Sequence, residues 1–525
     1  MSSGQDEPPT KPCHNCRRRR LKCDRSLPGC QKCIKTGQEC LGYGKLFLWN
    51  QGVASRGKMM GKSIPIQTPK PPRRQDDTMA VVSNTLMGPT PSLIDPIFQD
   101  LGHSSRLYLS HFADEFCKAL VTYDMPNLNP FRDLIPLTRE HAVLLHMAIA
   151  NSAVHMANRY AMETQSAAVT AQSLKGFAVG QSVIQTQPLQ VLNGQAARFY
   201  HDALVAKQKA LQLLRHALQH VNAGNRDVLL AAIHLFANFE LITSGKGDCI
   251  VHVEGARRLI ECFGTESSPM MGKLRDYLIS DCLTFYILGS TVVSSRSRAN
   301  ASRHFQYVLP LLERAESNSY LSCPAVLLQI MLLASYLSGG QSTSAAEEQQ
   351  QPLSLEAEAA ALLQRAQSFD VHAWAQGVQG ISSDHDDYES RVHVASAHKS
   401  AICLYIHRAV PTAALLDSEQ TEMLVSDVIG HLALIGRDDN LIKGTAWPTF
   451  VAGAETADPA RRAWIADRLV MLWRIMLWGY LPTALETLHV IWGTDDECPN
   501  GETGAGSREG WLQKLKRLGI EWMIV

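Results

Sequence analysis

The chain has 525 residues, of which 45% are apolar, so most of it can bury a sizeable core and wholesale disorder is excluded. Fifty basic residues balance fifty acidic ones, but residues 1–80 hold sixteen Lys and Arg against six Asp and Glu, a net charge of +10 that the rest offsets. A basic segment ahead of an acidic body suggests an arm that binds a polyanion. The polar N-terminus predicts no signal peptide. The best apolar stretch, 464–481, contains Asp467, Arg468 and Arg474, which argues against a membrane span.

Six cysteines near the N-terminus form an internal duplication. They follow the spacing C-x2-C-x6-C-x6-C-x2-C-x6-C, and the first three shifted by 17 residues give the last three: Cys13, Cys16, Cys23, Cys30, Cys33 and Cys40. Zinc prefers four ligands in a tetrahedron, so six thiolates complete two sites if two sulfurs bridge both ions. The duplication selects the leading cysteines, Cys13 and Cys30, as bridges. The sequence therefore predicts two Zn²⁺ ions. Three disulfides or unrelated core cysteines are the alternatives. A chain without a signal peptide is expected in a reducing compartment, and this expectation and the regular spacing both oppose the alternatives.

The two halves of this duplication differ in charge. Between its second and third cysteines, the second half is nearly neutral. The first half carries five cations there: Arg17, Arg18, Arg19, Arg20 and Lys22. A short helix after Cys16 would present these side chains to phosphates and base edges, and arginine suits bidentate contact with guanine in the major groove. A basic run alone is more often a nuclear localisation signal or a solvated face. Its place between metal-ligand cysteines favours DNA binding, and nuclear import can use the same residues.

Residues 46–100 are predicted to form a basic linker. Prolines at positions 65, 69, 71 and 72 interrupt the segment, and no heptad pattern runs through it, so it cannot form a coiled coil. Six basic residues there could follow the phosphates of DNA: Arg56, Lys58, Lys62, Lys70, Arg73 and Arg74. A fragment of residues 1–100 should therefore be monomeric.

Helix-period patterns dominate from residue 101 to 525, and strand alternation is scarce. Apolar faces are predicted for three helices from these residues: Leu109, Phe112, Phe116 and Leu120; Leu145, Ala148, Ile149, Ala153 and Met156, with Thr138 as the cap; and Leu204, Leu211, Leu214 and Leu218. The run 229–242 is nearly all apolar and predicts a central buried helix. Further helical patterns occupy 391–408, 417–435, 461–490 and 510–522. We expect a mainly α protein with a small N-terminal cluster, 1–45, a flexible linker, 46–100, and a large all-helical domain, 101–525.

The cysteine motif resembles that of a known family, the fungal Zn2Cys6 binuclear zinc-cluster transcription factors. The matching residues are Cys-His-Asn-Cys-Arg-Arg-Arg-Arg-Leu-Lys-Cys-Asp over 13–24 and Pro-Gly-Cys-Gln-Lys-Cys over 28–33. The segments Asn129–Leu137 and His252–Ile260 resemble the family's helical regulatory region, and 46–61 resembles a subgroup that includes acriflavine-sensitivity regulators.

The resemblance implies a zinc-dependent, sequence-specific regulator of RNA polymerase II genes that works in the nucleus with the transcription machinery. Residues matching Arg19 and Arg20 would approach the bases of a CGG triplet, and Arg17, Arg18 and Lys22 would contact mainly phosphates. Control of a metabolic gene cluster, secondary metabolism included, or of a drug response is plausible for this family. Family members usually dimerise through a coiled coil that this chain lacks, so a homodimer through the helical domain stays open.

Two other function classes compete with this interpretation. An enzyme is disfavoured because the glycine-rich stretch 57–63 has three residues between its glycines, where a phosphate-binding loop needs four, and because no G-x-S-x-G or H-E-x-x-H motif occurs. The chain could also be a ligand-sensing interaction protein whose DNA binding is subordinate, since large helical domains often hold apolar pockets.

Overall fold

The computed structural model describes residues 11–27, 29–36, 40, 43, 98, 100–125, 128–173, 194–222, 224–263, 272–292, 308–338, 355–378, 387–496 and 509–525. The chain divides into two compact units, Met1–Pro91 and Ser92–Val525. The first unit contains α1 (His14–Arg18) and α2 (Gln31–Lys35). The predicted linker falls almost entirely outside the described residues.

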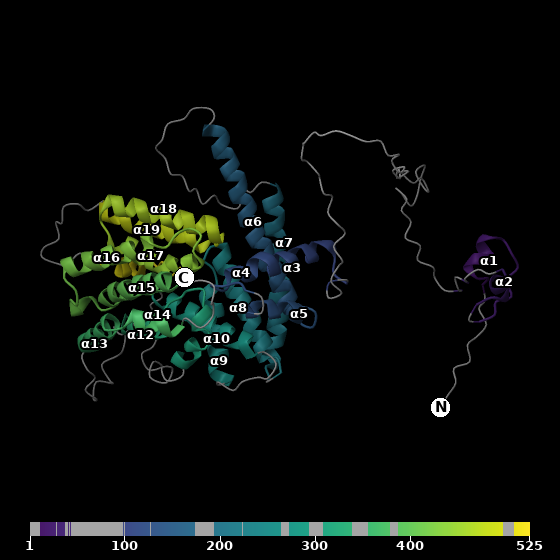
Figure 1. The fold of residues 1–525 in the computed structure, drawn as a ribbon, viewed down its shortest axis with the longest axis horizontal. Coiled ribbons are helices and arrows are strands. Elements are labelled where there is room, and N and C mark those ends of the chain that lie inside the picture. Colours follow the sequence, from purple (N-terminus) through teal and green to yellow (C-terminus); the bar gives the residue numbers. More distant parts are fainter. Residues whose placement is uncertain are drawn as a thin grey trace, which may run out of the picture. The chain divides into compact units, whose positions relative to one another are not determined.

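The second unit, which we call the body, is built from helices (Figure 1). Its elements include α3 (His103–His111), η2 (Phe112–Phe116), α4 (Cys117–Ala119), η3 (Pro130–Asp133), α5 (Leu134–Leu137), α6 (Ala142–Ser173), α7 (Gly194–Ala217), α8 (Arg226–Thr243), α9 (Cys249–Phe263), α10 (Gly272–Ser290), α12 (Ala325–Ser338), α13 (Leu355–Gln367), α14 (Val371–Val378), α15 (Tyr388–Ala409), α16 (Ser418–Ala433), η9 (Asn440–Thr445), α17 (Ala446–Glu455), α18 (Pro459–Met476), α19 (Tyr480–Asp496) and α20 (Trp511–Arg517). Within the described ranges, β-type backbone pairing is limited to one isolated antiparallel bridge between Val121 and Ser319. The predicted fold class, a mainly α protein, is confirmed.

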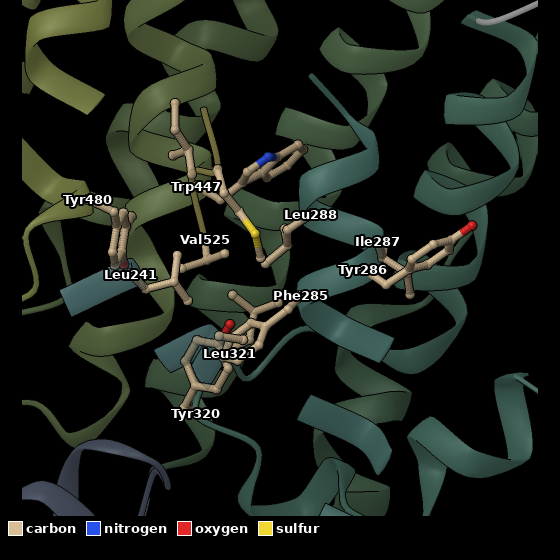
Figure 2. Packing of buried hydrophobic residues seen from close by; sticks show 14 of the residues in the cluster. Leu241, Phe285, Tyr286, Ile287, Leu288, Tyr320, Leu321, Trp447, Tyr480 and Val525 are labelled. Carbon is tan, nitrogen blue, oxygen red and sulfur yellow. The ribbon is translucent and has the colours of Figure 1, made fainter. Parts of the chain in front are cut away.

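Helix α8 lies at the centre of the body. Every residue from Asp227 to Ile242 is buried, which confirms the prediction of a central helix over 229–242. Helices α6, α9, α10 and α19 pack against it. The neighbouring α10 is buried along most of its length from Leu274 to Ser290. Figure 2 shows how side chains from α8, α10, α17 and α19 meet in this core.

The predicted face of the first body helix is confirmed, although the helix is not uniform. Leu109, Phe112, Phe116 and Leu120 are all buried. The turn between Phe112 and Phe116 is a π-helix, η2, inserted between α3 and α4. A π-turn widens the helix by one residue per turn and so changes the direction of the side chains that follow.

The predicted apolar face of α7 is wrong. Leu204 and Leu211 are 43% and 40% exposed, Leu218 beyond the helix end is also exposed, and Leu214 alone of the four predicted leucines is buried. The residues that α7 buries are chiefly small: Ala196, Ala203, Ala206 and Ala210. Helix α7 packs along α6 over most of its length (Figure 1). Small side chains allow two helix axes to approach closely, which hydrophobicity alone does not reveal.

Thr138 does not cap α6 as predicted. Its backbone N–H donates to Leu134 O, and its hydroxyl donates to Ile135 O at 2.6 Å, so Thr138 closes the preceding α5 instead. Helix α6 begins four residues later, at Ala142.

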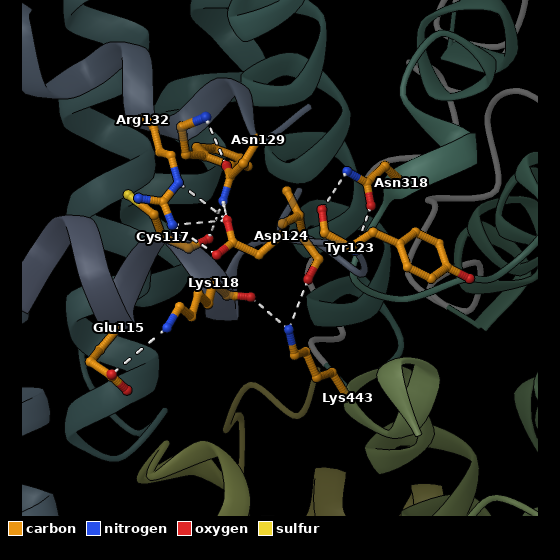
Figure 3. A network of polar contacts seen from close by, with 11 residues as sticks. Glu115, Cys117, Lys118, Tyr123, Asp124, Asn129, Arg132, Asn318 and Lys443 are labelled. Carbon is orange, nitrogen blue, oxygen red and sulfur yellow. Dashed lines mark hydrogen bonds and ion pairs between the residues drawn. The ribbon is translucent and has the colours of Figure 1, made fainter. Parts of the chain in front are cut away.

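The polar residues of the segment Asn129–Leu137 hold the start of the body together (Figure 3). Asn129 donates to Cys117 O at 2.9 Å, and Arg132 pairs with Asp124 at 2.7 Å. Lys443, from η9, donates to Lys118 O at 2.6 Å and to the carbonyl of Val121 at 2.9 Å. Burial lowers the pKa of Lys443 to about 8. The motif therefore has a structural role in ordering residues 117–132, and Lys443 joins this region to a distant part of the chain.

The predicted helical stretch 461–490 is interrupted. Helix α18 ends before Leu477, whose φ is 58°, and α19 begins at Tyr480. Gly479 between them donates to Ile242 O at 2.9 Å, which brings its backbone against the end of α8. A β-carbon on Gly479 would lie 2.2 Å from Thr243 O and 2.6 Å from Ile242 O. Glycine is required here by close backbone approach.

We expect Gly479→Ala to lower the free energy of unfolding of the body by about 3 kcal/mol, because rigid backbone atoms cannot make room for the new methyl group. The matched control is Gly493→Ala on α19, where a β-carbon meets nothing within 4 Å. It should be neutral or stabilising by up to ~1 kcal/mol, since alanine favours a helix. Urea unfolding of both variants measures the difference, and equal midpoints would contradict the steric argument.

Candidate metal centre and nucleic-acid interface

The six cysteines of the first unit converge in two groups of four. One group consists of Cys13, Cys16, Cys23 and Cys30, and the other of Cys13, Cys30, Cys33 and Cys40. Within each group all sulfur atoms lie within 4.8 Å of one another. The groups share Cys13 and Cys30, whose sulfurs are 3.5 Å apart. Four sulfurs at such distances match the donor set of a tetrahedral zinc site.

The sequence duplication is repeated in the local structure. Cys13 and Cys30 are the N-caps of α1 and α2, and each sulfur accepts the N–H of the cysteine three residues later at 3.4 Å. The N–H of Cys13 donates to the sulfur of Cys23, and the N–H of Cys30 to that of Cys40, both also at 3.4 Å. Each half thus folds its three cysteines around the start of its own helix, and the two helices are related by the same shift of 17 residues.

The chemistry of the cluster fits a cation. Cys13, Cys16, Cys30 and Cys33 are buried, and the partly buried side chains packed on them are Cys23, Cys40 and Tyr43. Burial raises the pKa of the Cys13 thiol to about 12 and also raises the pKa values of Cys16 and Cys30. Buried thiols that resist ionisation become thiolates when a metal ion compensates the charge. Burial opposes ionisation of Cys23 as well, but N–H groups of Cys13 and Arg25 lower its pKa to about 7.

The prediction that the basic run lies in a helix that follows Cys16 is wrong. Helix α1 begins before that cysteine, at His14, and ends at Arg18. Arg20 has a φ of 54°, its N–H donates to Arg17 O, and the N–H of Leu21 donates to Cys16 O at 2.9 Å. These two bonds form a Schellman motif that closes the helix.

The basic run therefore spans the end of α1 and continues beyond it. The side chains of Arg17, Arg19, Arg20 and Lys22 are exposed, and that of Arg18 lies outside the described part of the structure. A left-handed residue is normally glycine, because a β-carbon makes this conformation unfavourable. An arginine at position 20 is consistent with a need for its side chain.

Sequence reasoning missed the role of Asp24. Its carboxylate accepts a hydrogen bond from the hydroxyl of Ser26 at 2.5 Å and from the N–H groups of Gln31 and Lys32 at 2.9 and 3.1 Å. These bonds hold the pKa of Asp24 well below its usual range, with that from Ser26 contributing most. Asp24 thus ties the end of the first half to the first turn of α2. Tyr43 adds a second tie, since its hydroxyl donates to Ser26 O at 2.7 Å.

Comparison with known proteins identifies both units. Residues 106–524 match the model of the fungal specific transcription factor domain, and residues 11–49 match that of the fungal Zn(2)-Cys(6) binuclear cluster domain. The chain belongs to the fungal Zn(2)-Cys(6) transcription factors. Because the chain belongs to this family, the protein binds zinc, binds DNA and regulates transcription, and it is not an enzyme. Such domains imply a nuclear location.

Two relatives support this assignment. The acriflavine sensitivity control protein acr-2 of Neurospora crassa is 32% identical over 611 aligned positions, which cover 98% of this chain and 97% of the relative. The oleate activated transcription factor 3 of Kluyveromyces lactis is 54% identical over 33 residues, which is 6% of this chain and 5% of the relative. No solved structure matches the chain. Among the described helices of this family member, none is long and apolar enough to cross a membrane.

We expect Asp24→Asn to speed the loss of zinc to a chelator several-fold, because an amide accepts hydrogen bonds from the start of α2 less strongly than a carboxylate. The matched control is Gln31→Ala, which alters an exposed side chain at the same turn and keeps the backbone donor. Zinc release can be followed with a coloured chelator. Equal rates in Asp24→Asn and Gln31→Ala would show that this carboxylate does not support the cluster.

Proposed function

We propose that the protein is a zinc-dependent transcription regulator that reads CGG-type triplets through a cluster of two Zn²⁺ ions. The proposal rests on one observation: the six sulfurs form two groups of four that share Cys13 and Cys30. In this arrangement each ion has four thiolate ligands, and the two shared sulfurs bridge. Two Zn²⁺ and six thiolates carry a net charge of −2, which the surrounding lysines and arginines offset.

The proposed DNA contacts divide by chemistry. Arg19 and Arg20 follow the helix end and are exposed, which suits bidentate contact with guanine O6 and N7 in the major groove. Lys22 is a flexible point charge and suits phosphate, as do Arg17 and Arg18. In this arrangement the first half faces DNA and the second half supports it.

The rest of the chain is proposed to regulate this contact. We assign residues 1–45 to DNA binding, 46–100 to a basic linker that follows phosphates, and 101–525 to a regulatory domain that contacts the transcription machinery. Dimerisation through the body would add a second triplet. The name of the acr-2 relative concerns sensitivity to a drug, which supports control of drug-response genes as the target set; a metabolic gene cluster is the second choice.

We expect the purified protein to contain two zinc ions per chain by metal analysis. Cys13→Ala and Cys30→Ala should each lose both ions, because each sulfur contacts both, whereas Cys16→Ala should lose mainly one. Each structural zinc contributes about 10 kcal/mol or more to folding at neutral pH, so the cluster should unfold when the metal is removed. One zinc per chain, or equal losses in all three variants, would refute the bridged arrangement.

Arg19→Ala and Arg20→Ala should each lose about 1–3 kcal/mol of discrimination at a G·C pair in a zinc-dependent gel shift with CGG-containing DNA. Lys22→Ala should weaken binding to all sequences alike and lower the salt slope by about one phosphate contact.

Arg20→Gly separates recognition from folding. Glycine suits the left-handed backbone of position 20, so this variant should hold its zinc at least as well as the parent while losing the same base discrimination. If Arg19→Ala, Arg20→Gly and Lys22→Ala all weakened specific and random DNA equally, the division into base and phosphate contacts would be wrong.

A further inference from the structure

Exposed apolar side chains of the body are concentrated on α7 and the turn that follows it. Of the fifteen large apolar side chains that are exposed in the described residues, six fall within the range 204–221: Leu204, Val205, Leu211, Leu213, Leu218 and Val221. Each of the six is 37% to 46% exposed. A single exposed leucine is ordinary on a protein surface, whereas a group of them on one helix is typical of an interaction surface.

Three of these leucines form a stripe along the helix, which we call the leucine stripe. Leu204, Leu211 and Leu218 follow one another at intervals of seven residues, or about two turns, so they share one face. Helix α7 packs its buried alanines along α6, and the leucine stripe stays exposed beside that contact (Figure 1). Apolar residues that recur every seven positions form the seam along which two helices pack in a coiled coil. The stripe therefore has the spacing at which a further helix can pack.

The exposed charges of α7 are positive. Arg198, Lys209 and Arg215 are exposed cations of this helix. The one acidic residue within 194–222 is Asp202, which is half-buried and accepts a hydrogen bond from the hydroxyl of Tyr108 at 2.6 Å. Residues 81–525 together carry a net charge of −10, because residues 1–80 carry +10 and the whole chain is neutral. A positive helix face is therefore an exception on an acidic body.

Polar residues beside the leucine stripe define the chemistry of a partner. Gln208 and Arg215 follow Leu204 and Leu211 by four positions, and both are exposed. In a coiled coil the residues that flank the seam face the flanking residues of the other helix, and opposite charges there select the partner. A carboxylate on the other helix would pair with Arg215 and accept a hydrogen bond from Gln208.

We propose that the exposed face of α7 docks an acidic amphipathic helix of another protein. The apolar residues of that helix cover the leucine stripe, and its carboxylates pair with the cations of α7. The proposal names a surface for the contact between the body and the transcription machinery, and it rests on that part of the proposed function.

Other occupants fit this face less well. A second copy of α7 would bring cations against cations, because no fully exposed carboxylate lies within 194–222. Residues 174–193, which join α6 to α7 in the sequence, contain no Asp or Glu that could pair with these cations. Nucleic acid offers phosphates to the cations but nothing that covers the leucines. A lipid surface takes up a helix with a broad apolar face, whereas this stripe is narrow and is flanked by Gln208 and Arg215.

The test uses the full-length, zinc-loaded protein and two fluorescently labelled peptides of three heptads each. Both peptides carry leucine at the seam positions, and the flanking positions are Glu in one and Lys in the other. The acidic peptide should bind roughly ten-fold or more tightly than the basic one, and this preference should shrink as salt is added, because exposed charges are screened. Fluorescence anisotropy measures both affinities. Equal affinities, or no binding of the acidic peptide, would overturn the proposal.

Three variants locate the binding. Leu211→Glu should weaken the acidic peptide roughly ten-fold or more, because it removes an apolar contact and adds a like charge. Arg215→Glu should weaken the acidic peptide and strengthen the basic one. The matched control is Met423→Glu on α16, which changes an exposed apolar side chain of another helix and should bind both peptides as the parent does. Acidic-peptide binding that Leu211→Glu and Arg215→Glu leave unchanged would refute the site. If Leu211→Glu fails to fold, the inverted preference of Arg215→Glu decides the question.

Further measurements separate the other occupants. A dimer in sedimentation that Leu211→Glu dissociates would assign the face to a second copy, and binding to phosphatidylserine vesicles that the same variant loses would assign it to lipid. Acidic-peptide binding that begins only when residues 174–193 are replaced by a Gly-Ser linker of equal length would assign it to that segment. Each of these results would overturn the proposal. The gel shift with CGG-containing DNA should be the same in all variants, so a failure of the docking surface is distinguishable from a failure of the proposed DNA recognition.

Discussion

The burial of α8 on every side is the constraint on which the body depends. A helix without a solvent face must find partners for each polar side chain it carries, and α8 carries four that are buried: Asp227, His234, Asn238 and Glu240. Arg275 on α10 lies 3.3 Å from Asp227, Asp281 on α10 faces His234, and Lys207 on α7 pairs with Glu240. The polar residues of one helix thereby fix the register of its neighbours, in addition to the apolar contacts that hold them.

The cysteine cluster obeys a different rule. Its buried side chains are cysteines, and no aliphatic core surrounds them in the described part of the first unit. A domain so small cannot gain enough stability from apolar burial, which explains why metal ligands take the place of a core. The chain therefore combines two kinds of interior, one ordered by coordination chemistry and one by packing.

The sequence predicted the first kind of interior more fully than the second. Ligand spacing is local, so the duplication, the six cysteines and the basic run could all be identified from the chain. The tie from Asp24 to α2 joins residues that are seven positions apart, and the left-handed backbone of Arg20 leaves no compositional mark, so neither was predicted.

In the body, the hydrophobic periodicity predicted which segments form helices, but it did not predict which helices pack against one another. The exposed leucines of α7 misled the assignment of its face because the approach of α6 selects alanine there. The break at Gly479 depends on the carbonyls of α8, more than 230 residues earlier, which no local pattern contains.

The uneven burial of the six cysteines has a chemical consequence. Four sulfurs are shielded from solvent, whereas Cys23 and Cys40, one from each half, are partly exposed. Oxidants and electrophiles reach thiolates in proportion to their exposure and ionisation. We therefore expect oxidative damage to the cluster to begin at Cys23 and Cys40 rather than at the four buried sulfurs.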